Sequence, residues 1–106
     1  MKKYVISCSV LISLATLAVA GAVPSLERGK ELFTGTQLGT NGKSCAGCHP
    51  DGKGLEQAAA YDEGELGQII NQCIKNPLKG NALDPASVDM KSLILYIRTF
   101  ANNSKG

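Results

Sequence analysis

The sequence predicts an all-α fold, and three observations lead to this prediction. Three segments, one before and two after the middle of the chain, carry apolar side chains at helical spacing. No segment alternates apolar and polar residues in the way that a half-buried strand does. The stretches between the helical segments are rich in Gly, Pro, Asn and Thr, as loops are. We therefore expect one small domain of three to four helices without a sheet.

The first predicted helix runs from Leu26 to Phe33. Ser25 stands directly before it and is a favourable N-cap residue. Gly29 lies in the middle of this helix, where glycine is about 1 kcal/mol less favourable than alanine. Its presence there indicates that another helix approaches closely. Residues 34–44 follow as a loop.

The middle predicted helix begins at Asp62 or Glu63 and continues through about Lys75, before Pro77. Residues 50–54 are expected to form a loop, and residues 55–61 at most one irregular helical turn. The apolar face of the middle helix consists of Leu66, Ile69, Ile70, Cys73 and Ile74.

The last predicted helix follows a loop over residues 78–86, is capped by Ser87 and continues through about Ala101. Its apolar face consists of Met90, Leu93, Ile94, Ile97 and Phe100.

The first 22 residues have the pattern of a secretory signal peptide. A basic start at Lys2 and Lys3 precedes an apolar run over residues 4–18, and Ala20-Gly21-Ala22 forms a small-residue cleavage site. The apolar run is short for a membrane anchor, which needs about 20 residues. We therefore expect cleavage after residue 22, a mature domain over residues 23–106, and export to a bacterial periplasm or cell surface without stable membrane insertion.

The mature domain would be small and electrically balanced. Residues 23–106 hold nine basic and nine acidic side chains, and no basic patch favours nucleic acid. They contain no Trp, two Phe and two Tyr. A chain of this size buries little apolar surface and usually needs a disulfide, a metal or a cofactor for stability.

The segment Cys45-Ala46-Gly47-Cys48-His49 has the pattern of a covalent haem attachment site. Two residues between the cysteines let both sulfurs reach one edge of a porphyrin, and His49 can bind the iron as proximal ligand. A redox disulfide would require a βαβ pattern, which the sequence lacks. A zinc site made of Cys45, Cys48, His49 and Cys73 is a remaining alternative.

These features resemble class I c-type cytochromes. The resemblance rests on Gly29-x3-Phe33 in the first helix, on the Cys45–His49 motif, and on the sequence LILYI over residues 93–97. It implies a small cytochrome c fold around one covalently attached haem c. It also implies that the first and last helices cross, with Gly29 and Phe33 against Leu93 and Tyr96.

Residues 73–97 also resemble the haem domains of thiosulfate dehydrogenase-like cytochromes. The resemblance rests on Cys73, the Lys79-Gly80 pair, Ser87-x-x-Met90 and a helix that contains Tyr96. It implies an alternative function, as a haem subunit or enzyme in sulfur-compound oxidation with Cys73 as iron ligand. The present chain has one haem motif where those proteins carry two, so we expect an electron carrier and not an enzyme.

The sequence offers two sulfur side chains as candidates for the sixth iron ligand. His49 is the only histidine, so a second histidine ligand from this chain is excluded. Met90 is the only Met after cleavage, and Met/His ligation is the commonest arrangement in the family that the chain resembles. Cys73, on the apolar face of the middle helix, is the alternative sulfur ligand. A third possibility is Lys79, a water molecule or an open position. We expect Met90.

The predicted function is one-electron transfer between larger redox proteins by a monomeric, exported monohaem cytochrome. Lys75, Lys79 and Lys91 are candidates for a docking patch. A gas or redox sensor with an open iron position is the remaining alternative, although such sensors usually carry a signalling domain.

Overall fold

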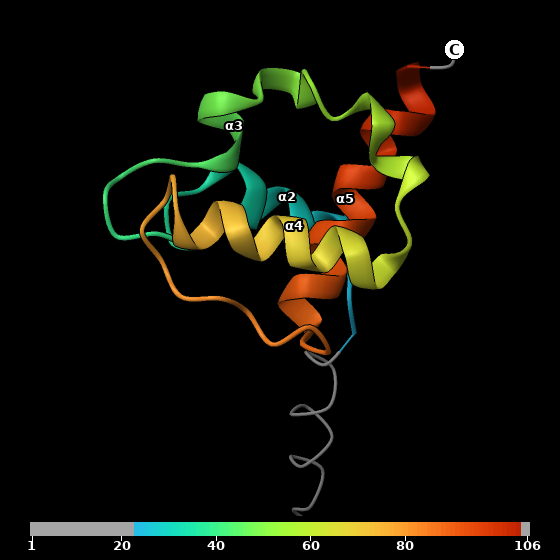
Figure 1. Cartoon of the computed structure of the whole chain (residues 1–106). Coiled ribbons are helices and arrows are strands. Elements are labelled where there is room, and N and C mark those ends of the chain that lie inside the picture. Colours follow the sequence, from blue (N-terminus) through green and yellow to red (C-terminus); the bar gives the residue numbers. More distant parts are fainter. Residues whose placement is uncertain (1–22, 105–106) are drawn as a thin grey trace, which may run out of the picture.

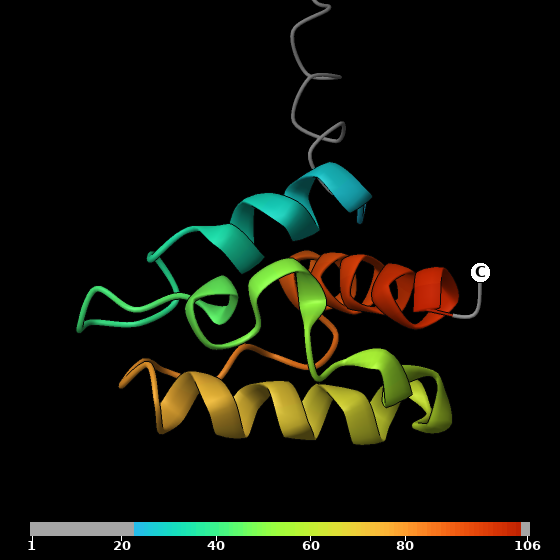
Figure 2. The same ribbon diagram turned by 90° about the horizontal axis from the view of Figure 1, so that it is seen from above.

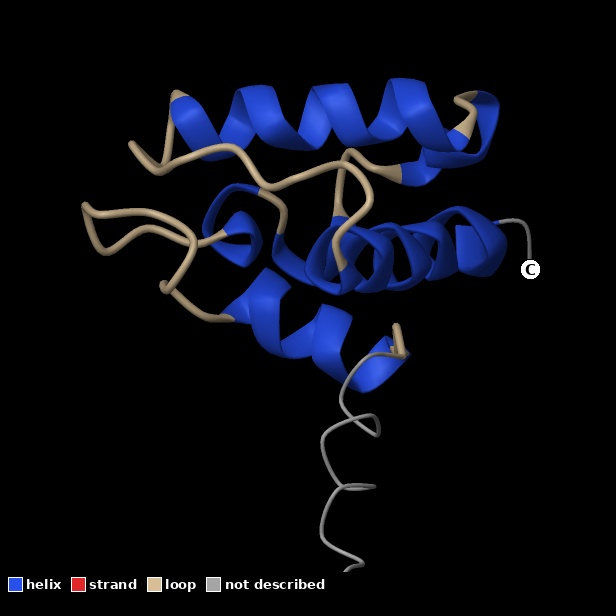
Figure 3. Ribbon diagram, turned by 90° about the horizontal axis from the view of Figure 1, so that it is seen from below, coloured by secondary structure: helices blue, strands red, loops and turns tan. Residues whose placement is uncertain are grey.

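The computed structural model describes residues 23–104, and this part of the chain is all-α, as the sequence predicts (Figures 1 and 3). Its α-helices are α2 (Leu26–Thr34), α3 (Cys45–Cys48), α4 (Glu63–Lys75) and α5 (Val88–Ser104). Two 3-10 helices, η2 (Pro50–Gly52) and η3 (Glu56–Ala60), lie between α3 and α4, and no strand occurs in residues 23–104. The predicted signal peptide lies outside the described residues.

The predicted helix starts are confirmed. The Ser25 hydroxyl accepts a hydrogen bond from the Arg28 backbone N–H at 3.0 Å, which begins α2. Asp62 begins α4 with a capping box, in which its carboxylate accepts from the Glu65 N–H and the Glu65 carboxylate accepts from the Asp62 N–H. Ser87 caps α5 in the same way, with the Met90 N–H as donor at 3.1 Å.

Two predicted boundaries were wrong. Residues 50–52 form the 3-10 turn η2 and not a loop, because Pro50 has a backbone angle suited to the start of a helix and the Gly52 N–H donates to the His49 carbonyl at 2.9 Å. Helix α5 continues past Ala101 to Ser104, because no Gly or Pro stands before Gly106 to end it.

Helices α2 and α5 cross, and Gly29 lies at the crossing point (Figure 2). A Cβ atom at position 29 would overlap the Ser92 carbonyl oxygen and would lie 2.7 Å from the Cβ of Tyr96. The crossing inferred from the resemblance is therefore present, with Ser92 in place of Leu93 beneath Gly29. It explains why a residue that weakens an isolated helix stands here.

Polar contacts and aromatic rings hold the two crossing helices together. The Ser25 N–H donates to the hydroxyl of Ser92, which is wholly buried, at 3.0 Å. Farther along the crossing, the rings of Phe33, Tyr96 and Phe100 form a cluster with centroids 5.1–5.4 Å apart. Phe33 thus links α2 to α5 on the side that faces α4.

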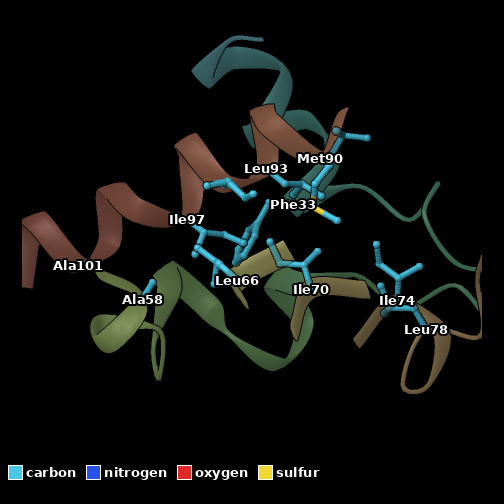
Figure 4. Packing of buried hydrophobic residues seen from close by; sticks show 12 residues of the cluster. Phe33, Ala58, Leu66, Ile70, Ile74, Leu78, Met90, Leu93, Ile97 and Ala101 are labelled. Carbon is cyan, nitrogen blue, oxygen red and sulfur yellow. The ribbon is translucent and has the colours of Figure 1, made fainter. Parts of the chain in front are cut away.

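Helix α4 lies on the opposite side of α5 from α2 (Figure 2) and completes the core. Figure 4 shows the buried side chains of these helices meeting between the ribbons. The core residues are Leu32, Phe33, Ala58, Leu66, Ile70, Ile74, Leu78, Met90, Leu93, Ile94, Ile97 and Ala101.

Candidate cofactor site

The short helix α3 carries both cysteines of the motif. The Ser44 hydroxyl caps it by accepting from the Gly47 N–H at 3.1 Å, and the His49 N–H donates to the Cys45 carbonyl at 2.9 Å. Residues three positions apart on a helix lie on the same side. Cys45 and Cys48 accordingly line the same cavity.

His49 lines this cavity too, and its ring is fixed by one hydrogen bond. The Nδ1 atom lies 2.8 Å from the Lys53 carbonyl oxygen. A carbonyl can only accept, so in the neutral imidazole Nδ1 carries the hydrogen and Nε2 keeps its lone pair. Histidines that bind metals are usually oriented in this way, by donating their other ring nitrogen to a carbonyl or carboxylate. His49 is therefore prepared to act as a ligand through Nε2.

The turn behind His49 is held against α5. Gly52 has a φ of +78°, which L side chains rarely adopt, and a Cβ there would overlap the ring of Phe100. The close approach of the Gly52 backbone to Phe100 fixes η2 on α5. It thereby fixes the carbonyl of Lys53, the next residue, to which His49 is bonded.

The cavity lies between α3 and α4 and has a volume of about 90 Å³. Apart from Cys45, Cys48, His49 and Cys73, its walls are apolar. They consist of Phe33, Leu55, Leu66, Ile69, Ile70, Pro77, Leu78 and Ile97.

The apolar face of α4 packs in the core and also lines the cavity. Leu66, Ile70 and Ile74 are buried in the core, whereas Ile69 and Cys73 are exposed toward the cavity, which Leu66 and Ile70 also line. Cys73 thus faces the cavity from α4, and Cys45 and Cys48 face it from α3.

The three thiols influence one another. Burial, together with the neighbouring Cys73, raises the pKa of Cys45 to about 11. Burial, together with the neighbouring Cys48, also raises the pKa of Cys73. Both side chains are therefore neutral thiols at neutral pH when nothing is bound between them.

Met90, the expected sixth ligand, lies elsewhere. It is wholly buried in the core and does not line the cavity. A Cβ at Gly67 of α4 would lie 3.8 Å from the Met90 sulfur, so the thioether packs between α4 and α5. Of the two sulfur candidates for the sixth position, the cavity wall presents Cys73.

The thiols and the histidine at the cavity form neither a disulfide nor a closed zinc site. Cys45, Cys48 and Cys73 are all free, so no disulfide joins them. Within residues 23–104, no three His, Cys, Asp or Glu side chains come close enough to hold one metal ion. The four potential zinc ligands, Cys45, Cys48, His49 and Cys73, line the cavity without converging on one point.

No protein-family model, no curated protein and no solved structure matches this chain. Within residues 23–104, no helix has the length and apolar character needed to cross a membrane.

Sequence reasoning did not identify several residues that shape the site. The role of the Lys53 carbonyl was not predicted, because every residue has a backbone carbonyl and the residue type does not show which one accepts a hydrogen bond. Leu55, Pro77 and Leu78 were assigned to irregular segments, although each lies next to a motif or helix end. Apolar residues at such positions, isolated in otherwise polar loops, are a signal that could have identified them.

Proposed function

We propose that this chain is an exported monohaem c-type cytochrome with a small cytochrome c fold, and that it carries single electrons between larger redox proteins. One observation carries the proposal. Cys45, Cys48 and His49 line one wall of an apolar cavity, and the Lys53 carbonyl holds the His49 ring with Nε2 available. The free state of Cys45, Cys48 and Cys73 is in keeping with it.

The residues of the chain would have distinct roles. Cys45 and Cys48 would hold the porphyrin covalently, each through a thioether bond to one vinyl group. His49 would bind the iron through Nε2, with its Nδ1 hydrogen donated to the Lys53 carbonyl. The apolar walls exclude water and so help to set the reduction potential. Bound haem supplies a one-electron ferric/ferrous couple.

An anaerobic redox titration of the protein exported from a host that attaches c-type haem tests the proposal. We expect a single reversible one-electron transition, and no turnover of thiosulfate with an external acceptor. A matched pair of variants, His49→Ala and His49→Gln, should retain the thioethers but shift or abolish this transition. A protein that is exported, folded and without a redox transition would contradict the proposal.

A second candidate function follows from the position of Cys73. The cavity presents this thiol on the wall formed by α4, whereas Met90 is buried in the core. We propose, as the alternative, that the chain is a haem subunit or enzyme in sulfur-compound oxidation, with Cys73 as the distal ligand. Consumption of thiosulfate, abolished in Cys73→Ala, would support this alternative.

A further inference from the structure

The backbone carbonyl of Cys73 has an unusual hydrogen-bond donor. In a regular α-helix it would accept from the N–H four residues later, but that residue is Pro77, which has no N–H. The Leu78 N–H donates to the Cys73 carbonyl instead, at 3.3 Å. One position earlier the helix is regular, because the Asn76 N–H donates to the Gln72 carbonyl at 3.0 Å. The last turn of α4, which carries Cys73 on the cavity wall, is therefore completed by a residue outside the helix.

The segment that contains Leu78 is held by a loop that is distant in the sequence. The Thr40 N–H donates to the Leu78 carbonyl at 3.0 Å, and the Thr40 hydroxyl donates to the Lys79 carbonyl at 2.8 Å. The Asn41 side-chain amide donates to the Pro77 carbonyl at 2.8 Å. Three consecutive carbonyls beyond α4 thus accept hydrogen bonds from two consecutive residues of the loop before α3.

Two glycines let the backbones of these segments touch. A Cβ at Gly39 would overlap the Leu78 carbonyl oxygen, and a Cβ at Gly80 would overlap the Leu38 carbonyl oxygen. Figures 1 and 2 show the loop before α3 beside the C-terminal end of α4. We call the two paired segments the clasp, and they are residues 38–41 and 77–80.

The half of the clasp that follows α4 is also anchored to the helix and the core. The Leu78 side chain is buried in the core and lines the cavity. Lys79 has a φ of +59°, in the left-handed region that is common just after a helix, and it turns the chain back. The Gly80 N–H then donates to the Ile74 carbonyl at 2.7 Å. Leu78 and Gly80, both of the clasp, therefore donate to the last turn of α4 from outside the helix.

The clasp joins the two walls of the cavity at one end. Asn41 lies four residues before Cys45 on one wall, and Pro77 lies four residues after Cys73 on the other. The Asn41 side-chain oxygen also accepts from the Lys43 N–H at 3.2 Å, which fixes the amide that donates to Pro77. One side chain therefore connects the approach to α3 with the end of α4.

We propose that Thr40 and Asn41 are positioning residues for Cys73, and that the clasp holds its thiol on the cavity wall as the distal ligand. The role toward iron rests on the proposed function, with Cys73 as ligand. Thr40 and Asn41 are exposed and lie outside the cavity wall, so they act through the backbone of residues 77–79. Because a single hydrogen bond contributes modestly to stability, its loss should loosen the clasp without unfolding the domain.

Amide hydrogen exchange of the purified, exported protein, followed by NMR, measures the clasp directly. Asn41→Asp keeps an oxygen that can accept from the Lys43 N–H, but it cannot donate to the Pro77 carbonyl. We expect the Leu78 and Gly80 amides to exchange about fivefold faster in this variant, because the hydrogen bonds that protect them open more often.

Thr40→Val and Thr40→Ser form a matched pair. Valine removes the hydroxyl that donates to the Lys79 carbonyl, whereas serine keeps it. Exchange of the Leu78 amide should be faster in the first variant and close to native in the second. Thr34→Val is the control, because the Thr34 hydroxyl donates to the Lys30 carbonyl at 2.8 Å in α2. This control should leave the exchange of the Leu78 amide unchanged.

The axial-ligand signal of the ferric protein separates positioning from a purely structural role. In Asn41→Asp and Thr40→Val, near-infrared magnetic circular dichroism should show a reduced thiolate-type signal beside a second, non-thiolate species. Thr40→Ser and Thr34→Val should keep the native signal. A native signal in Asn41→Asp despite faster exchange at Leu78 would overturn the positioning role, and so would unchanged exchange at Leu78.

Failure of the proposed function would be recognised separately. If the exported protein carries no haem, the rate at which Cys73 reacts with iodoacetamide, followed by mass spectrometry of its peptide, replaces the axial-ligand signal. A changed rate in Asn41→Asp and a native rate in Thr34→Val would support the clasp as the device that positions Cys73. Equal rates in the native protein and in Asn41→Asp would overturn it.

Discussion

Replacement of Gly29 by alanine is expected to lower the free energy of unfolding by about 2–3 kcal/mol. The added methyl group would overlap the Ser92 carbonyl oxygen of α5, a backbone atom that can move only if the crossing helices separate. Ordinarily, alanine in place of glycine within a helix is favourable by up to about 1 kcal/mol. The predicted loss therefore has the opposite sign to the effect of helix propensity. Urea unfolding followed by circular dichroism would measure it.

Gly64→Ala is the matched control. Gly64 lies in the first turn of α4, and a Cβ there would meet only the Asp62 carboxylate oxygen, at 3.5 Å, an ordinary contact. This variant should be more stable than the native chain by about 0.4–1 kcal/mol. Equal stabilisation by both alanines would show that α2 and α5 do not approach closely at Gly29.

Cys73→Ala is expected to change the iron ligands, whereas Met90→Leu is expected to leave them unchanged. The reason is geometric, since Cys73 lines the cavity and Met90 packs against Gly67 in the core. Near-infrared magnetic circular dichroism of the ferric protein identifies the axial pair. We expect a thiolate-type signal that Cys73→Ala abolishes. Met90→Leu conserves volume and should cost less than about 1.5 kcal/mol of stability.

A methionine-type signal that Met90→Leu removes and Cys73→Ala preserves would restore the expectation drawn from the sequence. It would also require the Met90 end of α5 to rearrange when haem binds. The two variants therefore distinguish the two sulfur ligands without relying on stability.

The same signal should depend on pH. Burial raises the pKa of the Cys73 thiol, so the proton competes more strongly for its sulfur than for that of an ordinary cysteine. Iron must displace that proton to bind a thiolate. As the pH falls, protonation becomes more favourable, and the thiolate-type signal should decrease. A signal that persists unchanged to acid pH would contradict this assignment.

The fold was largely predictable because its helix boundaries depend on local chemistry. Ser25, Asp62 and Ser87 cap the helices that the sequence predicted, and Pro77 follows the end of α4. Gly29 also indicated a helix crossing, although Gly29 alone does not show which residue of the other helix it contacts. These features need only a few neighbouring residues, so a single sequence contains them.

The candidate site was only partly predictable. Cys73 and Met90 both occupy apolar helix faces, and periodicity does not distinguish a face that packs in the core from one that lines a cavity. The distinction arises from how α4 lies along both α5 and α3, which is a tertiary property (Figure 2).

The most direct test of covalent haem attachment is mass spectrometry of the exported protein after denaturation. We predict a mature chain beginning near Val23 with the added mass of one haem, and a peptide containing Cys45 and Cys48 that retains it. Cys45→Ala/Cys48→Ala should be exported without this mass, and Cys73→Ala should keep it. A native protein that loses its haem to acidified organic solvent, or that carries no haem on this peptide, would contradict the account.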